Sequence, residues 1–90
     1  MVKAMLVEIN GKRVCVAALS GKGNVNAAIH WWRDDGEGVL LDVVGIDDGE
    51  AAIWPAPHLQ FGDEVRIKMI DTEKGDPPIK QSTMVVPAKK

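Results

Sequence analysis

Cysteine and aromatic residues are scarce in this sequence, which has one cysteine, one phenylalanine and no tyrosine. Cys15 has no partner in the chain for a disulfide, so we expect a reducing compartment, the cytoplasm. Long apolar runs are also absent, since none approaches the roughly 20 residues that a membrane-spanning helix needs. The segment from Met5 to Ile9 is too short for a signal peptide and is interrupted by Glu8. We therefore expect no membrane partner.

A large excess of charge of either sign is missing too. The formal net charge is −2, and the 11 basic residues are scattered along the chain. Binding to the phosphates of a nucleic acid needs several clustered cations, so we expect no nucleic-acid partner. Ninety residues suffice for one domain with a thin core. We expect a single β-rich domain over 1–90, with a short polar tail near 87–90.

An Asn10-Gly11 pair between two apolar stretches, 3–9 and 12–19, predicts a β-hairpin. Asn-Gly is the strongest short signal for a two-residue type I′ turn. Such a turn places Ile9 opposite Lys12, and a continuous register then fixes every other pair. The expected core face consists of Met5, Val7, Val14 and Val16. The expected outer face carries Leu6, Cys15 and Ala17 and is too apolar to lie fully in water.

The segment 25–33 fits two structures. As a helix it would gather Val25, Ala28, Ile29 and Trp32 in one stripe, whereas as a strand it would place Trp31 and Trp32 on opposite faces. The loop composition on either side and the β propensity of the segment favour the strand. We predict a strand.

Further strands are predicted at 39–46, 51–54, 64–71 and 80–86, between turn signals such as Asp47-Asp48-Gly49. In the segment 64–71, Val65, Ile67 and Met69 alternate with charged residues, the period of a half-buried strand. Pro55-Ala56-Pro57 cannot supply ladder hydrogen bonds and is expected to be a connector. No segment predicts a helix convincingly. We predict an all-β fold, a small antiparallel β-sandwich or partly open barrel of six or seven strands.

The chain as a whole resembles a family of small uncharacterised bacterial β-rich proteins. The resemblance is carried by Asn10-Gly11-Lys12-Arg13-Val14-Cys15, the Trp31 region, Val44-Gly45-Ile46-Asp47, Gly62-Asp63-Glu64-Val65-Arg66-Ile67 and Asp76-Pro77-Pro78. Each of these is a strand or turn signature. The resemblance implies a β-rich single domain and implies no activity, cofactor or site residue.

Catalytic chemistry is not indicated. Cys15 lies in the middle of a predicted strand, where a small hydrophobic residue is usual, and a thiol nucleophile would need exposure and a nearby histidine. Ser20 and Ser82 lack the context of a nucleophile elbow. The Gly21-Lys22-Gly23 stretch lacks the spacing and the Lys-Ser/Thr pair of a phosphate-binding loop. We expect no catalytic residues and no enzyme activity.

Metal and cofactor sites are not indicated either. His30 and His58 are far apart in sequence and have no partner at a ligand spacing. The two Asp-Asp-Gly-Glu turns, at 34–37 and 47–50, are too short for a calcium loop, and Asp and Gly favour tight turns for backbone reasons alone. We expect no metal and no cofactor.

The tryptophans provide the candidate binding surface. On a strand, one of Trp31 and Trp32 can fill the core while the other is covered by the 55–57 connector, by the hairpin's outer face or by a partner. An exposed tryptophan beside polar groups could anchor a protein or stack on a sugar. The candidate residues are His30, Trp31, Trp32, Asp34 and Trp54.

On this basis we predict a non-enzymatic binding module that acts through a protein–protein surface. The reason is a surplus of apolar side chains on the expected outer faces, which association would cover. These residues are Leu6, Cys15, Ala17, Leu40, Val44 and Trp32. The partner is a second copy in a homodimer or another protein, as for an inhibitor or immunity protein. The alternative is binding of a carbohydrate or small ligand on a tryptophan platform.

Overall fold

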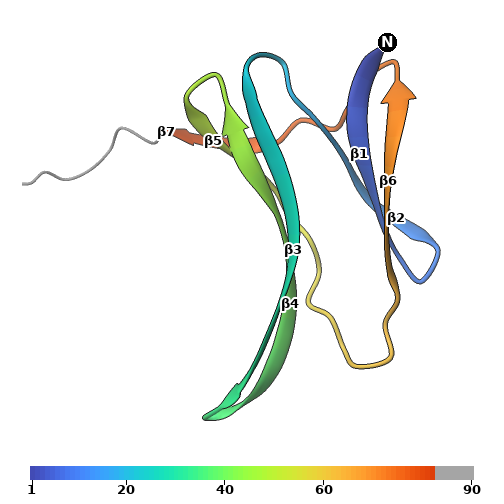
Figure 1. The fold of residues 1–90 in the computed structure, drawn as a ribbon, viewed down its shortest axis with the longest axis vertical. Helices are drawn as coiled ribbons and strands as arrows, with labels where there is room; N and C mark the ends of the chain where they lie inside the picture. The colour runs from blue at the N-terminus through green and yellow to red at the C-terminus, as the bar shows by residue number, and fades with distance from the viewer. Residues whose placement is uncertain (83–90) are drawn as a thin grey trace, which may run out of the picture.

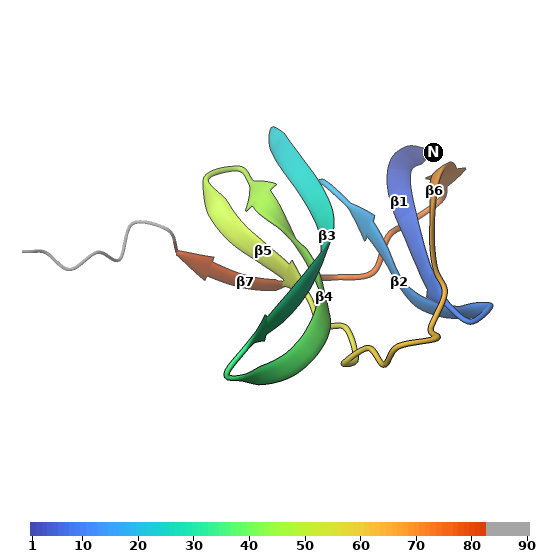
Figure 2. The ribbon, with the colours of Figure 1, turned by 60° about the horizontal axis from the view of Figure 1, so that its bottom comes forward.

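The computed structural model describes residues 1–82 and is an all-β sandwich of two antiparallel sheets (Figures 1 and 2). The first sheet has the strand order β2-β1-β6 and the second has the order β3-β4-β5-β7, so the predicted fold class is confirmed and the sandwich is not closed into a barrel. The seven strands are β1 (Val2–Ile9), β2 (Lys12–Ala18), β3 (Gly23–Asp34), β4 (Gly36–Asp47), β5 (Glu50–Trp54), β6 (Val65–Thr72) and β7 (Ile79–Ser82). The predicted polar tail near 87–90 and residues 83–86 of the last predicted strand lie outside the described residues.

Two tight turns have the backbone that their sequences predict. Asn10 and Gly11 have φ values of 53° and 82°, and Asp48 and Gly49 have φ values of 54° and 82°. Positive φ at both central residues defines a type I′ turn, whose twist matches that of the flanking strands. The type I′ turn predicted at Asn10-Gly11 is therefore confirmed, and the turn predicted at Asp47-Asp48-Gly49 is of the same type.

The segment 25–33 is a strand, as predicted, and forms most of β3. All twelve residues of β3 pair with β4 in one uninterrupted antiparallel register, from Gly23 opposite Asp47 to Asp34 opposite Gly36. The connector after β5 runs beside this hairpin, because His58 bridges to Leu40 on β4. Trp31 and Trp32 lie on opposite faces of β3, as strand geometry requires.

The predicted core face is confirmed for Met5 and Val7 of β1, and a β-bulge makes it wrong for β2. Ile9 opposes Lys12 and Glu8 opposes Arg13 as expected, but Val7 then opposes Cys15 instead of Val14. The extra residue shifts the register by one and exchanges the two faces of β2 beyond it. Cys15 and Ala17 therefore face the interior beside Val7, and they are buried rather than outside.

The core lies where β1 and β2 cover β4 and β5. Its buried members are Val7, Cys15, Ala17, Leu41, Val43, Ala52, Trp54 and Leu59. Small residues from β2 and β5 leave room for the one large ring among them, Trp54. Trp54 is 2% exposed, so it is a core residue and takes no part in the candidate binding surface.

Asp76 joins the two sheets beside Trp54. Its backbone N–H donates a hydrogen bond of 2.8 Å to the Val16 carbonyl. Its carboxylate accepts a hydrogen bond of 2.8 Å from the Val16 N–H and forms an ion pair with Arg13. Its carbonyl accepts a hydrogen bond of 2.9 Å from Nε1 of Trp54. One residue thus covers the free edge of β2 and satisfies the polar atom of the largest core side chain.

Replacing Trp54 with phenylalanine is expected to destabilise the protein by about 2–4 kcal/mol, because it leaves a cavity and an unsatisfied Asp76 carbonyl. Urea unfolding followed by far-ultraviolet circular dichroism measures this loss. Trp31→Phe is the matched control, and it should cost about 1 kcal/mol or less because its ring is largely exposed. Equal losses in the two variants would contradict the assignment of Trp54 to the core.

Candidate binding surface

The far end of the β3–β4 hairpin curves away from the first sheet (Figure 1). Four of the candidate binding residues lie together there, His30, Trp31, Trp32 and Asp34, and all four are exposed. The prediction that one tryptophan of the pair fills the core is wrong, since Trp31 is 58% exposed and Trp32 is 43% exposed. The hairpin extends past the part of the first sheet that would otherwise cover the inner-face ring of Trp31, and Trp32 lies on the outer face, which the first sheet does not reach.

Trp31 is held in place by three neighbours. Its Nε1 donates a hydrogen bond of 2.9 Å to Oε2 of Glu37, and its ring meets that of Phe61 edge to face at a centroid distance of 5.9 Å. The guanidinium of Arg33 lies 5.7 Å from the centre of the indole and also pairs with Glu37 at 3.7 Å. These contacts fix the orientation of an exposed indole before any partner arrives.

Trp32 lies on the opposite, outer face of the hairpin. A Cβ added at Gly38 would lie 2.1 Å from the indole, so the absence of a side chain at Gly38 is what allows the ring to rest on β4. The ring therefore rests on its own hairpin, at the position opposite Trp32 on β4. Beside it, Nε2 of His30 lies 3.0 Å from Oδ2 of Asp42.

The inner faces of the two sheets are uncovered along the edges formed by β3 and β6. In β6, Ile67 and Met69 lie opposite Val7 and Met5 and so share the core-facing side of the sheet, as the alternation predicts. They are nevertheless exposed, Met69 to 71%. We call the exposed side chains along these two edges the open side: Ile29, Trp31, Phe61, Ile67 and Met69.

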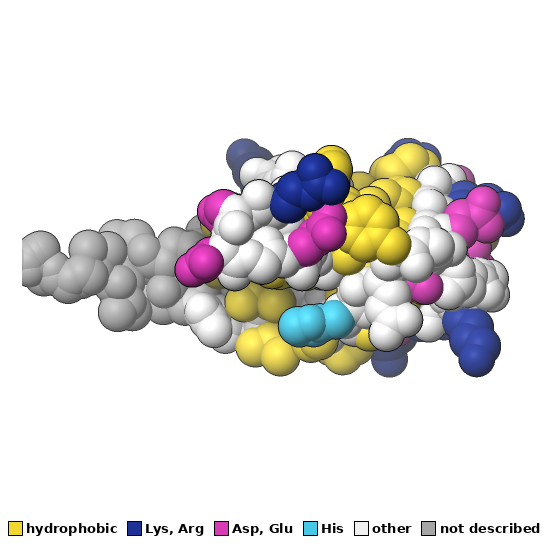
Figure 3. Space-filling view, turned by 90° about the horizontal axis from the view of Figure 1, so that it is seen from below, with side chains coloured by type: hydrophobic (Ala, Val, Ile, Leu, Met, Phe, Trp, Pro, Cys, Tyr) yellow, Lys and Arg dark blue, Asp and Glu magenta, His cyan; other side chains and the backbone are white. Residues whose placement is uncertain are grey.

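Two hollows lie between these edges. One of about 450 Å³ is lined by Met5, Val25 and Met69 among others, and one of about 240 Å³ by Ile29, Phe61 and Val65 among others. Seen from the end of the hairpin, hydrophobic side chains run across the surface between acidic and basic groups (Figure 3). The apolar surplus expected from the sequence therefore exists, at Trp32 and Val44 as predicted but otherwise at different residues.

The residues that the sequence assigned to that surplus are distributed differently. Cys15 and Ala17 are buried, Leu6 and Leu40 are half-buried, and Val44 is partly exposed on the outer face of the second sheet. The sequence reasoning missed Ile29, Phe61, Ile67 and Met69 as candidate binding residues. Their alternation identifies the face on which they lie, but it cannot tell whether another layer covers that face.

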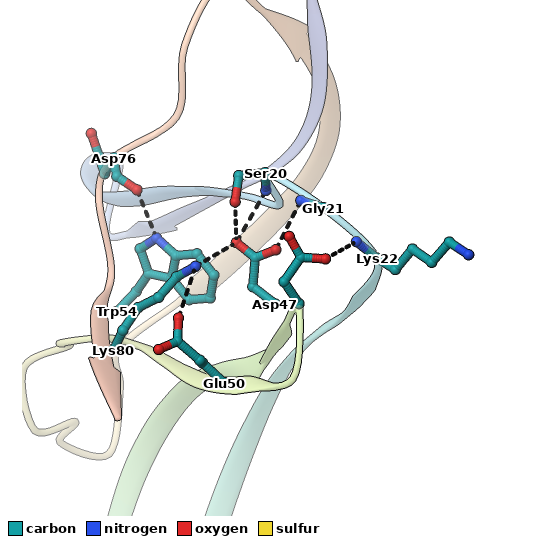
Figure 4. Close-up of polar contacts among 9 residues, drawn as sticks. Ser20, Gly21, Lys22, Asp47, Glu50, Trp54, Asp76 and Lys80 are labelled. Atoms are coloured by element: carbon teal, nitrogen blue, oxygen red, sulfur yellow. Dashed lines mark hydrogen bonds and ion pairs between the residues drawn. The ribbon is translucent and has the colours of Figure 1, made fainter. Parts of the chain in front are cut away.

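A buried carboxylate forms the densest polar cluster (Figure 4). Asp47 is 2% exposed, and it accepts hydrogen bonds from the Ser20 N–H at 3.1 Å, the Ser20 hydroxyl at 2.8 Å and the Gly21 N–H at 2.9 Å. Nζ of Lys80 lies 3.2 Å from the same carboxylate. The backbone and side-chain hydrogen bonds of Ser20 hold the pKa of Asp47 well below its usual value.

This cluster is structural. It ties the loop after β2 to the β4–β5 turn and to β7, and the Ser20 hydroxyl donates to a carboxylate instead of to a histidine base. Burial, followed by the charge of Asp76, raises the pKa of the Cys15 thiol, which disfavours the reactive thiolate. Within residues 1–82, no group of three or more His, Cys, Asp or Glu side chains could hold a metal ion. The same residues contain no helix capable of crossing a membrane.

The fit of Trp32 against Gly38 gives a local prediction. Gly38→Ala should displace the indole of Trp32 from β4 and increase the quenching of its fluorescence by iodide. The measurement is made in a Trp31→Phe background, where the other tryptophan, Trp54, is buried and contributes little to the quenching. The free energy of unfolding should change by only about 0.5 kcal/mol, because the site is at the surface. Gly36→Ala is the control. An added Cβ at Gly36 meets nothing within 4 Å, but φ is 115°, so this variant strains the backbone without displacing the ring. Unchanged quenching in the Gly38 variant would contradict this packing.

The lowered pKa of Asp47 predicts how stability depends on pH. Its contribution is fully present above the pKa of an unfolded aspartate, about 4, and is lost as the pH falls towards the lower folded value. Asp47→Asn should lower the thermal midpoint at pH 7 by roughly 5 °C or more, and the two proteins should converge as the pH falls below about 4. Scanning calorimetry across this range measures the effect, with Asp35→Asn at the exposed hairpin tip as the control. A gap that stays constant down to pH 2 would contradict the prediction.

Comparisons of the chain with protein-family models, with curated proteins and with solved structures give no match. The resemblance to a bacterial β-rich family therefore stays a prediction. Function has to be argued from the geometry of the open side and the hairpin.

Proposed function

We propose that this protein is a non-enzymatic binding module that recognises a protein partner through its open side. The observation that carries the proposal is that Ile67 and Met69 lie on the core-facing side of their sheet and are exposed. Side chains with this alternation are normally covered by a second layer. A partner supplies the missing cover.

The composition of the open side supports a protein partner. Tryptophan, phenylalanine and methionine are enriched at protein–protein interfaces, and tryptophan is among the residues that most often dominate binding energy. Trp31 is also held in one orientation by Glu37, Arg33 and Phe61, so little side-chain entropy is lost on binding. Large exposed apolar patches on soluble proteins mark interaction sites.

Charged groups border the apolar residues and are suited to orient a partner. Arg33 and Glu37 lie beside Trp31, and Asp63 lines the smaller hollow. Hydrogen bonds from the Gln60 N–H and the Asn10 side chain lower the pKa of Asp63, which keeps this carboxylate charged. An apolar centre with a polar border is the usual anatomy of a recognition surface.

A carbohydrate or small ligand is the second candidate, and the surroundings of Trp32 favour it. The partly exposed indole lies on the face of β3 that also carries Asn24, Asn26 and His30, the last paired with Asp42. A ring with amide and imidazole groups beside it suits stacking on a sugar. Trp31 is less suitable, because Phe61 and Arg33 already occupy part of its surroundings.

The proposed setting follows from the same residues. We place the protein in the cytoplasm of a bacterium, where the buried single thiol of Cys15 stays reduced. Its partner is a second copy or a larger protein that it blocks, as an inhibitor or immunity protein would. No catalytic step is proposed for it.

Photocrosslinking from the open side tests the proposal. A benzophenone amino acid placed at Met69 or at Phe61 should form protein adducts in the cells in which the chain naturally occurs. The control position is Lys68, which neighbours Met69 on β6 but lies on the other face of the sheet. The adducts are identified by mass spectrometry, and each labelled protein is first shown to be folded by circular dichroism.

Adducts that form at Met69 and Phe61 at least about tenfold more often than at Lys68 would support a partner seated on the open side. Equal labelling at all three positions, or none, would overturn the proposal. In that case a panel of sugars, read by quenching of Trp32 emission in a Trp31→Phe background, tests the carbohydrate alternative.

A further inference from the structure

We infer that the partner on the open side is a second copy of this chain, joined through antiparallel pairing of β3 with β3 about a two-fold axis at Ala28. This inference rests on the proposed function and names its partner. It starts from the backbone edges of the two sheets and not from the apolar side chains alone. The resulting dimer has one continuous sheet of eight strands.

β3 is the edge strand that lacks protection. Unpaired edges invite pairing with another chain, and proteins block them with charges, prolines or covering segments. Asp76 bonds to the edge of β2 at Val16, β6 carries Arg66, Lys68 and Asp71, and β7, the other edge of the second sheet, is short and carries Lys80. In contrast, the ten residues from Gly23 to Trp32 contain no Lys, Arg, Asp, Glu or Pro.

The available edge of β3 is also long. Among the described residues, its twelve residues form a ladder with β4 alone. At about 3.3 Å per residue, they offer about 40 Å of backbone donors and acceptors. An exposed edge of this length, charged only at Arg33 and Asp34, is a template for pairing with another chain.

The sequence of β3 is self-complementary in one register. With the axis at Ala28, Lys22, the residue just before β3, lies opposite Asp34 of the other copy, which places an ion pair at each end of the ladder. On the inner face Val25 meets Trp31 and Ala27 meets Ile29, so apolar side chains meet apolar side chains. On the outer face Asn26 meets His30 and Asn24 meets Trp32, and Ala28 meets its own copy across the axis.

Neighbouring registers lose this complementarity. Moving the axis to Ile29 places the charged Arg33 opposite Val25 on the inner, apolar face. Moving it to Ala27 places Lys22 opposite Trp32 and removes its ion pair with Asp34. Charge matching and apolar matching therefore select the same axis.

Pairing in this register also covers the β3 part of the open side. Ile29 and Trp31, exposed in the single chain, gain Ala27 and Val25 of the second copy as cross-strand neighbours on the same face. The two open sides then face each other over the middle of the continuous sheet. A closed two-fold dimer ends the exposure of β3 without creating a new unpaired edge there.

Cross-linking at the axis tests the register. In a Cys15→Ala background, Ala28→Cys should be joined almost completely to its copy by a short thiol-to-thiol reagent. Asn26→Cys is the matched control on the same face, since two copies of residue 26 would lie about 13 Å apart along the strands, beyond the reach of the reagent. Light scattering of the unmodified protein should give the mass of two chains.

A charge exchange tests the ends of the ladder. Lys22→Glu and Asp34→Lys should each weaken the dimer by about threefold to thirtyfold, because each removes two ion pairs and opposes like charges. The double variant should restore the dissociation constant to within about threefold of the original, and added salt should reduce all of these differences. The dissociation constants come from sedimentation velocity over a dilution series.

The results separate this inference from the function on which it rests. A mass of one chain at all concentrations, or equal cross-linking at positions 28 and 26, overturns pairing through β3. If the same monomer still forms adducts with another protein from Met69 and Phe61, the binding function stands and the second copy is not its partner. If those positions label nothing either, both proposals fail.

Discussion

The extra residue in β2 determines which side chains of the first hairpin reach the interior. The Asn10-Gly11 turn starts the ladder in the expected register, and the bulge then shifts it so that Cys15 and Ala17 face Val7. Two small residues on that face leave space for Trp54 from the opposite sheet. In the unshifted register, the larger Val14 and Val16 would point at the same space. The packing of the core therefore depends on one irregularity in one ladder.

The remaining architecture follows from the unequal reach of the two sheets. β1 and β2 cover β4 and β5, whereas the β3–β4 hairpin extends past them and β6 extends beside them. The core is closed on the side where Asp76 covers β2 and binds Trp54, and where the Asp47 cluster ties the loops together. Among the described residues the opposite side has no such cover, so its inner-face residues are exposed. The contacts that stabilise the sandwich and the proposed binding surface thus lie on opposite sides of one molecule.

The exposed side chains of β3 and its exposed backbone edge have one cause, the position of β3 as the last strand of its sheet. A side chain such as Ile29 is uncovered because β3 is the last strand of its sheet, and the backbone of β3 is unpaired for the same reason. One partner that adds a strand beside β3 would satisfy the backbone and cover the side chains together. This is why an added strand fits the surface better than a partner that touches the side chains alone.

The sequence by itself determined the pleated secondary structure, both type I′ turns, the opposite faces of Trp31 and Trp32, and the clustering of His30, Trp31, Trp32 and Asp34 on one segment. Each of these depends on neighbours within a few residues, through backbone conformation and a period of two. Only the tertiary structure decided that Trp54 is buried, that both hairpin tryptophans are exposed, and that Cys15 faces inward. It also decided that Ile67 and Met69 lie uncovered. The bulge that exchanges the two faces of β2 has no local signal in its residues. Alternation assigns a residue to a face of a sheet, but only the position of the other sheet decides whether that face is covered.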